Sequence, residues 1–344
     1  MTIKYIYWYD DTGYGIAAKQ LIKSLVNNNI PLIQAGLKQN KKKPTEYHVQ
    51  EYHAKSDAYD IVFIHTSPHY INGFLESGRI NLAYCTWETT RLPQKWMQEL
   101  NKWAVVFVAS RFNKKCFEQS GVTKPIHLLP HISEFKGETI VSQMRESYKS
   151  DFTFYSIGML SERKNYLALI NAFSNAFSNG EAVKLIINTS KKDYTKPAFD
   201  LFKRLGYTYF FNLDYVGRVN QAIKADSRIY LFAGNWSSEQ ISQMHYSGDC
   251  YISLCKSEGW GLGSNDAVWF RKPIIITGFG GQLDFLPDDY ITFLPYKLIG
   301  INDAVRTEYN RENQERLIRI LIYRYKPRGM YMPINQNLHK KKNN

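Results

Sequence analysis

The sequence is poor in cysteine and has no long apolar run, and each absence excludes a class of protein. Its 344 residues include four cysteines, none in Cys-x-x-Cys spacing, so we expect neither a disulfide framework nor a structural zinc site. No stretch of about 18 apolar residues occurs, which argues against a membrane-spanning helix. The first residues lack a basic segment followed by an apolar one, so no signal peptide is expected. These absences favour a soluble, cytoplasmic protein, with peripheral contact to a membrane as an alternative.

The composition is otherwise that of an ordinary globular protein with excess positive charge. Apolar residues make up 44% and charged residues 22% of the chain, which excludes disorder over most of its length. The net charge is +13: residues 1–150 hold 19 basic and 13 acidic side chains, and residues 301–344 hold 10 and 4. A basic surface favours phosphate-bearing partners such as nucleotides, nucleic acid or anionic lipid. Solubility and genome composition explain the excess equally well.

Short apolar runs alternate with helical patterns along most of the chain. Strands are expected at 3–8, 30–35, 61–65, 82–87, 105–110, 152–157, 183–188, 229–233, 250–254 and 274–277. Helices are expected at 16–26, 93–103, 163–177, 196–205, 238–246 and 264–270. Such alternation indicates βαβ units with parallel sheets, here as two consecutive Rossmann-like α/β domains.

The domain bounds follow from the polarity of the chain. A polar stretch at 138–150 separates a domain over 1–150 from a second over 151–300. The basic segment 301–344 is expected to contain a helix over 312–325 and a frayed tail. In open α/β sheets, ligands bind at the carboxyl ends of the strands, so two such domains would face each other across a ligand cleft.

The segment Ser257-Glu-Gly-Trp-Gly-Leu-Gly follows an expected strand and enters a helix. Glycines at 259, 261 and 263 allow close backbone approach to a ligand, and the positive end of the helix suits a diphosphate. Glu258 and Asp266, eight positions apart, can accept hydrogen bonds from sugar hydroxyls. The alternative is a plain glycine-rich turn in which Asp266 stabilises the helix.

Two cations lie at the equivalent place after the first strand of the second domain. Arg163 and Lys164 follow Gly158 and precede a helix. Basic residues at a helix N-terminus oppose the helix dipole, so an anionic ligand explains them better than a solvated helix start. They are positioned to neutralise a leaving diphosphate.

These segments resemble a known family. Glu258-Gly-Trp-Gly-Leu, Asp266-Ala and Lys272-Pro-Ile-Ile-Ile resemble the EGFGL…EA…G-x-P-V-I block of GT-B glycosyltransferases of the GT4 family. The stretch from Ser156 to Asn165 resembles that family's VGRL…RKN segment. The sequence departs from the pattern in two places: Asp266 replaces the second glutamate, and Met159 stands where many relatives have arginine.

The resemblance implies a GT-B fold and a retaining hexosyltransferase that uses a UDP- or GDP-linked sugar. No Asp-x-Asp follows an expected strand, so we expect no required metal or other cofactor. The first acid, Glu258, would touch the transferred sugar, and the second, Asp266, the ribose. The catalytic set would be Glu258, Lys164 and Arg163. The donor-binding set would be Gly158, Arg163, Lys164, Glu258, Gly259, Trp260, Gly261, Leu262, Asp266 and Gly280.

The first domain resembles the family at two further places that would face the sugar or the acceptor. Gly13, Tyr14 and Gly15 resemble the glycine-rich loop after the first strand, although a plain turn explains them equally well. Trp87 and Glu88 belong to a WE…LP segment found in a subset of the family. Trp87 would stack on a sugar and Glu88 bind hydroxyls; otherwise they are core and loop residues.

The acceptor is not readable from the sequence, so three functions remain open. The first is transfer to a glycan, a lipid-linked sugar or a protein. The second is transfer to DNA bases, using the basic first domain. The third is a catalytically weakened sugar-nucleotide-binding protein, prompted by Met159 and Asp266. The basic first domain and tail would supply any anionic membrane or nucleic-acid surface.

Overall fold

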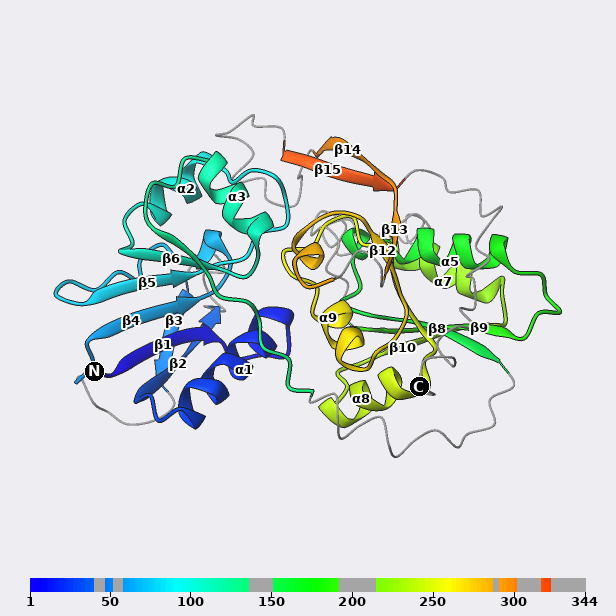
Figure 1. Cartoon of the computed structure of the whole chain (residues 1–344), viewed down its shortest axis with the longest axis horizontal. Coiled ribbons are helices and arrows are strands. Elements are labelled where there is room, and N and C mark those ends of the chain that lie inside the picture. The colour runs from blue at the N-terminus through cyan, green and yellow to red at the C-terminus, as the bar shows by residue number, and fades with distance from the viewer. Residues whose placement is uncertain are drawn as a thin grey trace, which may run out of the picture.

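The computed structural model describes residues 1–39, 47–51, 58–135, 151–191, 215–286, 291–301 and 317–322. They form two α/β lobes side by side, the first built from the N-terminal half and the second from the C-terminal half (Figure 1). The expected junction at 138–150 and the expected helix at 196–205 lie outside the described residues.

The first lobe is a seven-stranded sheet in the order β3-β2-β1-β4-β5-β6-β7. All neighbouring strands are parallel except β2 and β3. Its strands are β1 (Ile3–Trp8), β2 (Leu32–Gln39), β3 (Tyr47–Glu51), β4 (Ile61–His65), β5 (Ile80–Tyr84), β6 (Val105–Val108) and β7 (Ile126–Leu128). Its helices are α1 (Gly13–Asn27), η1 (Pro68–Tyr70), α2 (Gln94–Leu100) and α3 (Arg111–Gln119).

The second lobe is a six-stranded parallel sheet in the order β10-β9-β8-β11-β12-β13. Its strands are β8 (Phe152–Ile157), β9 (Val183–Thr189), β10 (Ile229–Ala233), β11 (Cys250–Ser253), β12 (Ile274–Thr277) and β13 (Ile291–Leu294). Its helices are η2 (Glu162–Lys164), α5 (Tyr166–Ala176), α7 (Tyr215–Lys224), α8 (Ser238–Ser247), α9 (Leu262–Trp269) and η4 (Gly281–Asp284).

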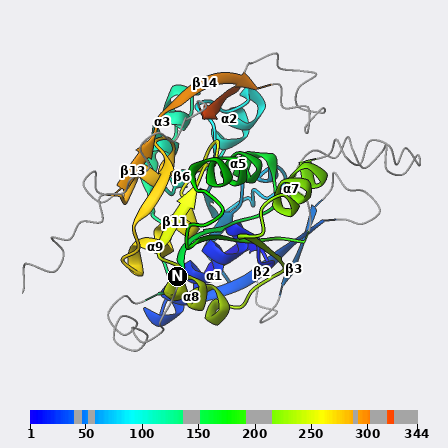
Figure 2. The ribbon, with the colours of Figure 1, turned by 90° about the vertical axis from the view of Figure 1, so that its right-hand side faces the viewer.

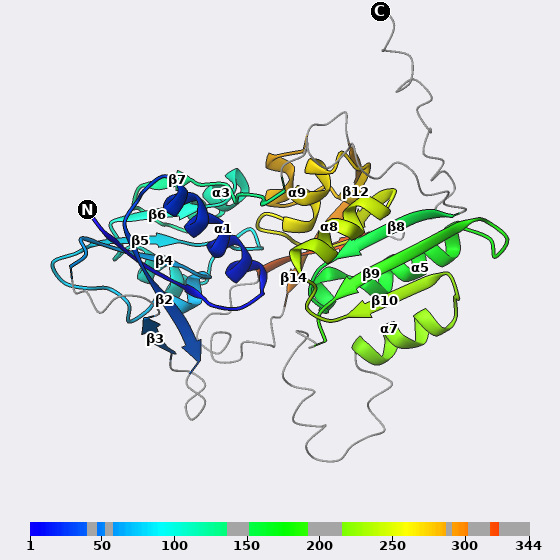
Figure 3. The same cartoon turned by 90° about the horizontal axis from the view of Figure 1, so that it is seen from below.

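Helices cover both faces of each sheet, so the central strands are buried on both sides. In β4, all five residues are buried, as the continuous apolar run predicts. In the second lobe, α5 and α7 lie on one face and α8 on the other (Figures 2 and 3). Successive residues of β8 separate accordingly: Phe154 joins the cluster on the α5 side and Tyr155 the cluster that contains Met244 of α8.

The two lobes meet at the positions where each strand order reverses. In the first sheet, β1 has β2 on one side and β4 on the other, and in the second, β8 lies between β9 and β11. Such switch points open a crevice at the carboxyl ends of the strands. Contacts between the lobes bridge this crevice: Ser110 Oγ of the first lobe donates to the Gly259 carbonyl 2.9 Å away. Trp260 of the second lobe packs into the cluster of Tyr5 and Phe63.

The expected C-terminal helix is wrong where the structure describes it. Residues 317–322 form strand β15 (Leu317–Ile322), paired antiparallel with β14 (Tyr296–Ile301). Three of these six residues are isoleucine, and β-branched side chains favour strands, so an available partner strand decides the conformation. The described helices include none with both the length and the apolar character to cross a bilayer.

Candidate active site

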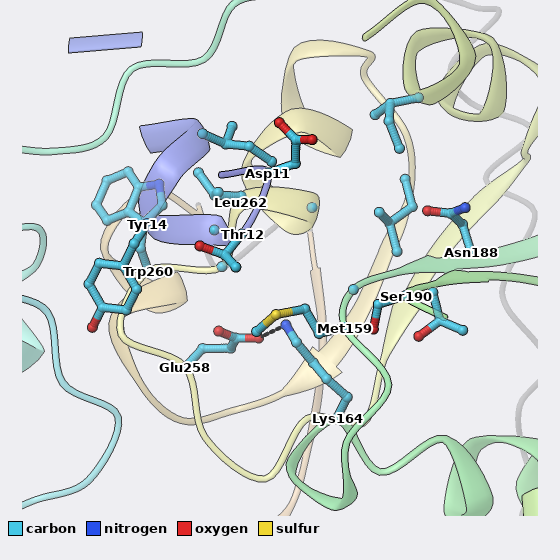
Figure 4. Close-up of a pocket in the computed structure, with 18 of the residues that line it drawn as sticks. Asp11, Thr12, Tyr14, Met159, Lys164, Asn188, Ser190, Glu258, Trp260 and Leu262 are labelled. Carbon is cyan, nitrogen blue, oxygen red and sulfur yellow. Dashed lines mark hydrogen bonds and ion pairs between the residues drawn. The ribbon is translucent and has the colours of Figure 1, made fainter. Parts of the chain in front are cut away.

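A cavity of about 280 Å³ lies between the lobes at the strand switch points (Figure 4). The loop after β1 forms one wall, and the loops after β8, β9, β10 and β11 form the other. From the first lobe it is lined by Asp11, Thr12, Gly13, Tyr14, Ile16, Thr86, Glu88 and His131. From the second it is lined by Ile157, Gly158, Met159, Arg163, Lys164, Asn188, Thr189, Ser190, Gly234, Asn235, Trp236, Ile241, and residues 258–263.

A cluster of four charged side chains occupies one end of this cavity. Lys164 Nζ contacts Glu258 Oε1, and the two side chains point toward one another in Figure 4. Arg163 Nη1 lies 3.3 Å from Glu258 Oε2, and its Nη2 lies 3.1 Å from Glu88 Oε1. Because Glu88 belongs to the first lobe, Arg163 also ties the two lobes together. The sequence predicted all four residues as site residues, and the structure brings them together.

Local backbone geometry aims both cations into the cavity. Ser161 begins the short helix η2, and its side chain accepts a hydrogen bond from the Lys164 N–H. Asn165 follows in the left-handed region with φ +59°, which ends η2 and starts α5. Such a φ is rare outside glycine and is best tolerated by asparagine, so this residue permits the turn that carries Arg163 and Lys164.

Ion pairing controls the charge state of the cluster. Burial alone would raise the pKa of Glu258, but Lys164 and Arg163 outweigh it and hold the pKa well below the usual range of a carboxyl. Burial likewise lowers the pKa of Arg163, but Glu88 and Glu258 more than compensate and raise it. Glu258 and Arg163 are therefore charged at neutral pH, and Arg163 contacts the carboxyl groups of both Glu88 and Glu258.

Two glycines with positive φ shape the loops beside this cluster. Gly280 has φ +99°, and a Cβ there would lie 2.4 Å from the Glu258 carbonyl oxygen. Gly261 has φ +94° and precedes α9, which places the N–H groups of the first turn of α9 at the cavity. Amide groups at a helix N-terminus favour an anion. Gly280 itself lies outside the cavity lining and acts by supporting the loop that carries Glu258.

Three other predicted residues lie outside the cavity lining. The Trp87 ring is 7% exposed and packs edge-on against Trp96, 4.7 Å between ring centroids, so Trp87 is a core residue. Gly15 lies inside α1, where a Cβ would overlap the Asp10 carbonyl. Asp266 accepts a hydrogen bond from Ser133 Oγ at 2.8 Å. Its position therefore does not support a ribose contact in this conformation.

Asp266 has an unusual charge state for a carboxyl. Burial raises its pKa to about 7, and the Ser133 hydrogen bond only partly opposes this effect. The contact joins α9 to the segment after β7, 133 residues away in the chain. Asp266 thus holds the second lobe against the C-terminal part of the first.

The sequence prediction missed several lining residues, most of which follow strands. Asn188 and Ser190 lie at the end of β9, and Asn235 and Trp236 follow β10. The side-chain Nδ2 of Asn188 is buried and has no hydrogen-bond partner among the described residues. Their position after strands of a parallel sheet was the only available signal, because no glycine pattern marks them.

Within the described residues, no three His, Cys, Asp or Glu side chains lie together in a group that could hold a metal ion. His65 is fully buried, and its Nδ1 lies 2.8 Å from the Tyr5 hydroxyl. His69 Nδ1 lies 2.8 Å from Ser67 Oγ.

No protein-family model matches the sequence, and no curated protein matches it either. Solved structures do match over most of the chain. HepE from Anabaena, solved in complex with UDP and glucose, is 14% identical, with a TM-score of 0.60 over 85% of this chain and 86% of that one. Sucrose-phosphate synthase from Thermosynechococcus elongatus is 12% identical, with a TM-score of 0.60 over 86% of both chains.

A third match is a UDP-forming α,α-trehalose-phosphate synthase from Burkholderia xenovorans. It is 10% identical, with a TM-score of 0.56 over 85% of this chain and 87% of that one. These structures are glycosyltransferases of the GT-B fold. The two-lobed fold predicted from the sequence is therefore confirmed as GT-B. At such identities, the likeness establishes the fold alone.

Proposed function

We propose that this protein is a retaining glycosyltransferase that moves a hexose-type sugar from a nucleotide diphosphate sugar to a hydroxyl of a glycan, a lipid-linked sugar or a protein. The observation that carries the proposal is the cavity between the lobes, where Arg163 and Lys164 face Glu258 beside the N-terminus of α9. UDP is the first nucleotide to test, because HepE was solved with UDP and glucose.

The arrangement suits the charge that develops in glycosyl transfer. The leaving diphosphate gains negative charge, which Arg163, Lys164 and the amides of residues 261–263 can stabilise. The sugar gains positive charge as it approaches an oxocarbenium ion, and the buried carboxylate of Glu258 can stabilise that charge or bind a hydroxyl. Retention would follow from attack on the face of the departing phosphate. Closed lobes would exclude water and suppress hydrolysis of the donor.

Donor binding has to compete with the ion pairs of the ligand-free protein. Both cations are already paired, Lys164 with Glu258 and Arg163 with Glu258 and Glu88. A diphosphate can replace the carboxylates as the partner of these cations, and Glu258 then becomes free to turn to the sugar. Met159 lines the same cavity and adds no charge to it. These cations are therefore the principal charged donor contacts that we propose.

A panel of nucleotide sugars tests the proposal. We expect UDP-glucose or a close analogue to raise the melting temperature of the wild type, since a ligand stabilises the state that binds it. Transfer or hydrolysis of that donor should be lost in Lys164→Ala and in Glu258→Ala. Lys114→Ala on the exposed part of α3 is the matched control. Full activity in both site variants, with intact folding, would show that the donor site lies elsewhere. Donor binding without turnover would favour a sugar-nucleotide-binding protein.

A further inference from the structure

Two aromatic side chains from different lobes meet at the cavity, and the proposed donor chemistry assigns no polar contact to either ring. His131 follows β7 of the first lobe, and Trp260 belongs to the loop before α9 of the second. Their rings lie 5.8 Å apart between centroids, with an interplanar angle of 85°. The contact therefore exists only where the lobes are closed on one another.

The hydrogen-bond network determines which nitrogen of His131 carries the proton. The Tyr84 hydroxyl donates its single proton to the Leu129 carbonyl, 2.7 Å away. It can therefore only accept from His131 Nδ1, which lies 2.9 Å from it. Burial lowers the pKa of His131 to about 3, so the ring is neutral at pH 7. Nε2 is consequently a hydrogen-bond acceptor.

Trp260 offers the complementary group. Trp260 is 7% exposed. Its indole Nε1 is buried and has no hydrogen-bond partner in the described part of the chain. An indole N–H can only donate, and a buried donor without a partner is costly. Because Trp260 lines the cavity, a ligand group is the candidate partner for this donor.

We propose that His131 Nε2 and Trp260 Nε1–H form a hydroxyl-binding pair that recognises one sugar hydroxyl in the cavity. A hydroxyl can accept from Trp260 and donate to His131 at the same time. An ionised diphosphate or carboxylate cannot donate, and an ammonium cannot accept, so the pair selects against these groups. The hydroxyl belongs to the transferred sugar or to an acceptor sugar. The identity of the ligand as a sugar rests on the proposed function; the donor–acceptor pair itself does not.

Two ring-preserving variants test the pair. Trp260→Phe and His131→Phe remove the donor and the acceptor but keep an aromatic ring at each position. If the hydroxyl belongs to the donor sugar, each variant should bind UDP-glucose about 3- to 30-fold more weakly in calorimetric titrations, with UDP binding unchanged. Because one hydroxyl bridges both groups, the double variant should lose less than the product of the two single losses.

A spectroscopic titration tests whether the bound hydroxyl belongs to an acceptor sugar. UDP-saturated protein is titrated with methyl α-glucoside, and the indole N–H resonance of Trp260, identified by its loss in Trp260→Phe, is followed. This resonance should move if the hydroxyl belongs to the acceptor, and His131→Phe should weaken the response. Nitrogen-15 spectra of labelled histidine should show His131 protonated at Nδ1. Trp236→Phe, a second tryptophan of the lining, is the matched control and should show no coupling to His131→Phe.

The outcomes separate this inference from the proposed function. Wild-type protein that binds neither UDP nor UDP-glucose refutes the function, and the methyl α-glucoside titration without nucleotide then tests the pair by itself. The pair is refuted if UDP-glucose affinity and the Trp260 resonance are both insensitive to sugar and to the variants. It is also refuted if the losses multiply independently, or if UDP binding falls as much as UDP-glucose binding.

Discussion

Replacing Glu258 by glutamine should weaken the folded protein and strengthen its binding of UDP. The carboxylate contacts Lys164 and lies 3.3 Å from Arg163. Glutamine keeps the shape of the side chain but removes its charge. In the ligand-free protein, Lys164 loses its recorded carboxylate partner, whereas Arg163 keeps Glu88 and the Ser257 carbonyl. The diphosphate of UDP can then bind Lys164 without displacing the Glu258 carboxylate.

The magnitude follows from burial. Breaking a buried ion pair by removing one partner costs about 3–5 kcal/mol, because the remaining charge stays buried. The side chains of Lys164 and Arg163 are 15% and 22% exposed, so water reaches them in part. We therefore expect a loss of about 2–3 kcal/mol in the free energy of unfolding. Removing the competition for Lys164 should tighten UDP binding by about tenfold, or ~1.4 kcal/mol.

Calorimetric titration with UDP and thermal unfolding with and without UDP measure both effects. Glu88→Gln is the matched control, because Glu88 pairs with Arg163 at 3.1 Å and its side chain is 34% exposed. That variant should change stability by less than 1 kcal/mol and UDP affinity by less than Glu258→Gln does. Weaker UDP binding by Glu258→Gln in a folded protein would refute competition between Glu258 and the diphosphate.

Three further variants test other contacts. Asp266→Asn should gain stability relative to wild type between pH 5 and pH 8, by about 2 kcal/mol. The native carboxyl has a pKa raised to about 7 and holds a proton that the unfolded chain loses near pH 4. The stability of the wild type therefore falls as pH rises through this window. The same pH dependence of the melting temperature in both proteins would contradict this. Gly280→Ala should cost at least ~2 kcal/mol in chemical denaturation and reduce activity, whereas Gly73→Ala, with φ +85° but nothing within 4 Å, should cost only backbone strain; equal losses would exclude the Glu258 clash. Met159→Arg should tighten UDP binding in low salt, and unchanged affinity would place Met159 away from the diphosphate.

Strands buried on both faces could be predicted closely from the sequence. The bounds of β1, β4, β8 and β12 agree with the apolar runs, because a two-sided core demands an uninterrupted run that ends where the chain reaches the surface. The bounds of β10 also agree, although β10 is an edge strand on which Tyr230 and Phe232 are exposed. The terminal strand β15 was mistaken for a helix. Its apolar residues fit both periods, and only its pairing with β14 decides between them.

Side chains that meet in the cavity were predictable where they lie in one short segment and not where their position depends on contacts between lobes. Arg163, Lys164 and Glu258 lie in short segments whose composition already indicates an anion and a sugar. The contact of Asp266 with Ser133 joins segments far apart in the chain, so neither the spacing from Glu258 nor the resemblance to the GT4 block could reveal it. The same limit applies to Trp87. The sequence pattern of a tryptophan beside a glutamate does not distinguish a core residue from a sugar-binding residue.

Net charge proves a poor guide to the potential inside the cavity. Residues 1–150 carry 19 basic and 13 acidic side chains, yet the charged lining residues described in the first lobe are Asp11 and Glu88. Residues 151–300 hold 15 basic and 14 acidic side chains and are nearly neutral, yet they supply both cations, Arg163 and Lys164. Few side chains line a cleft, and these dominate its potential because field lines are focused between low-dielectric walls. The described first-lobe wall therefore suits neutral hydroxyls better than phosphates, which agrees with the acceptor–donor pair of His131 and Trp260.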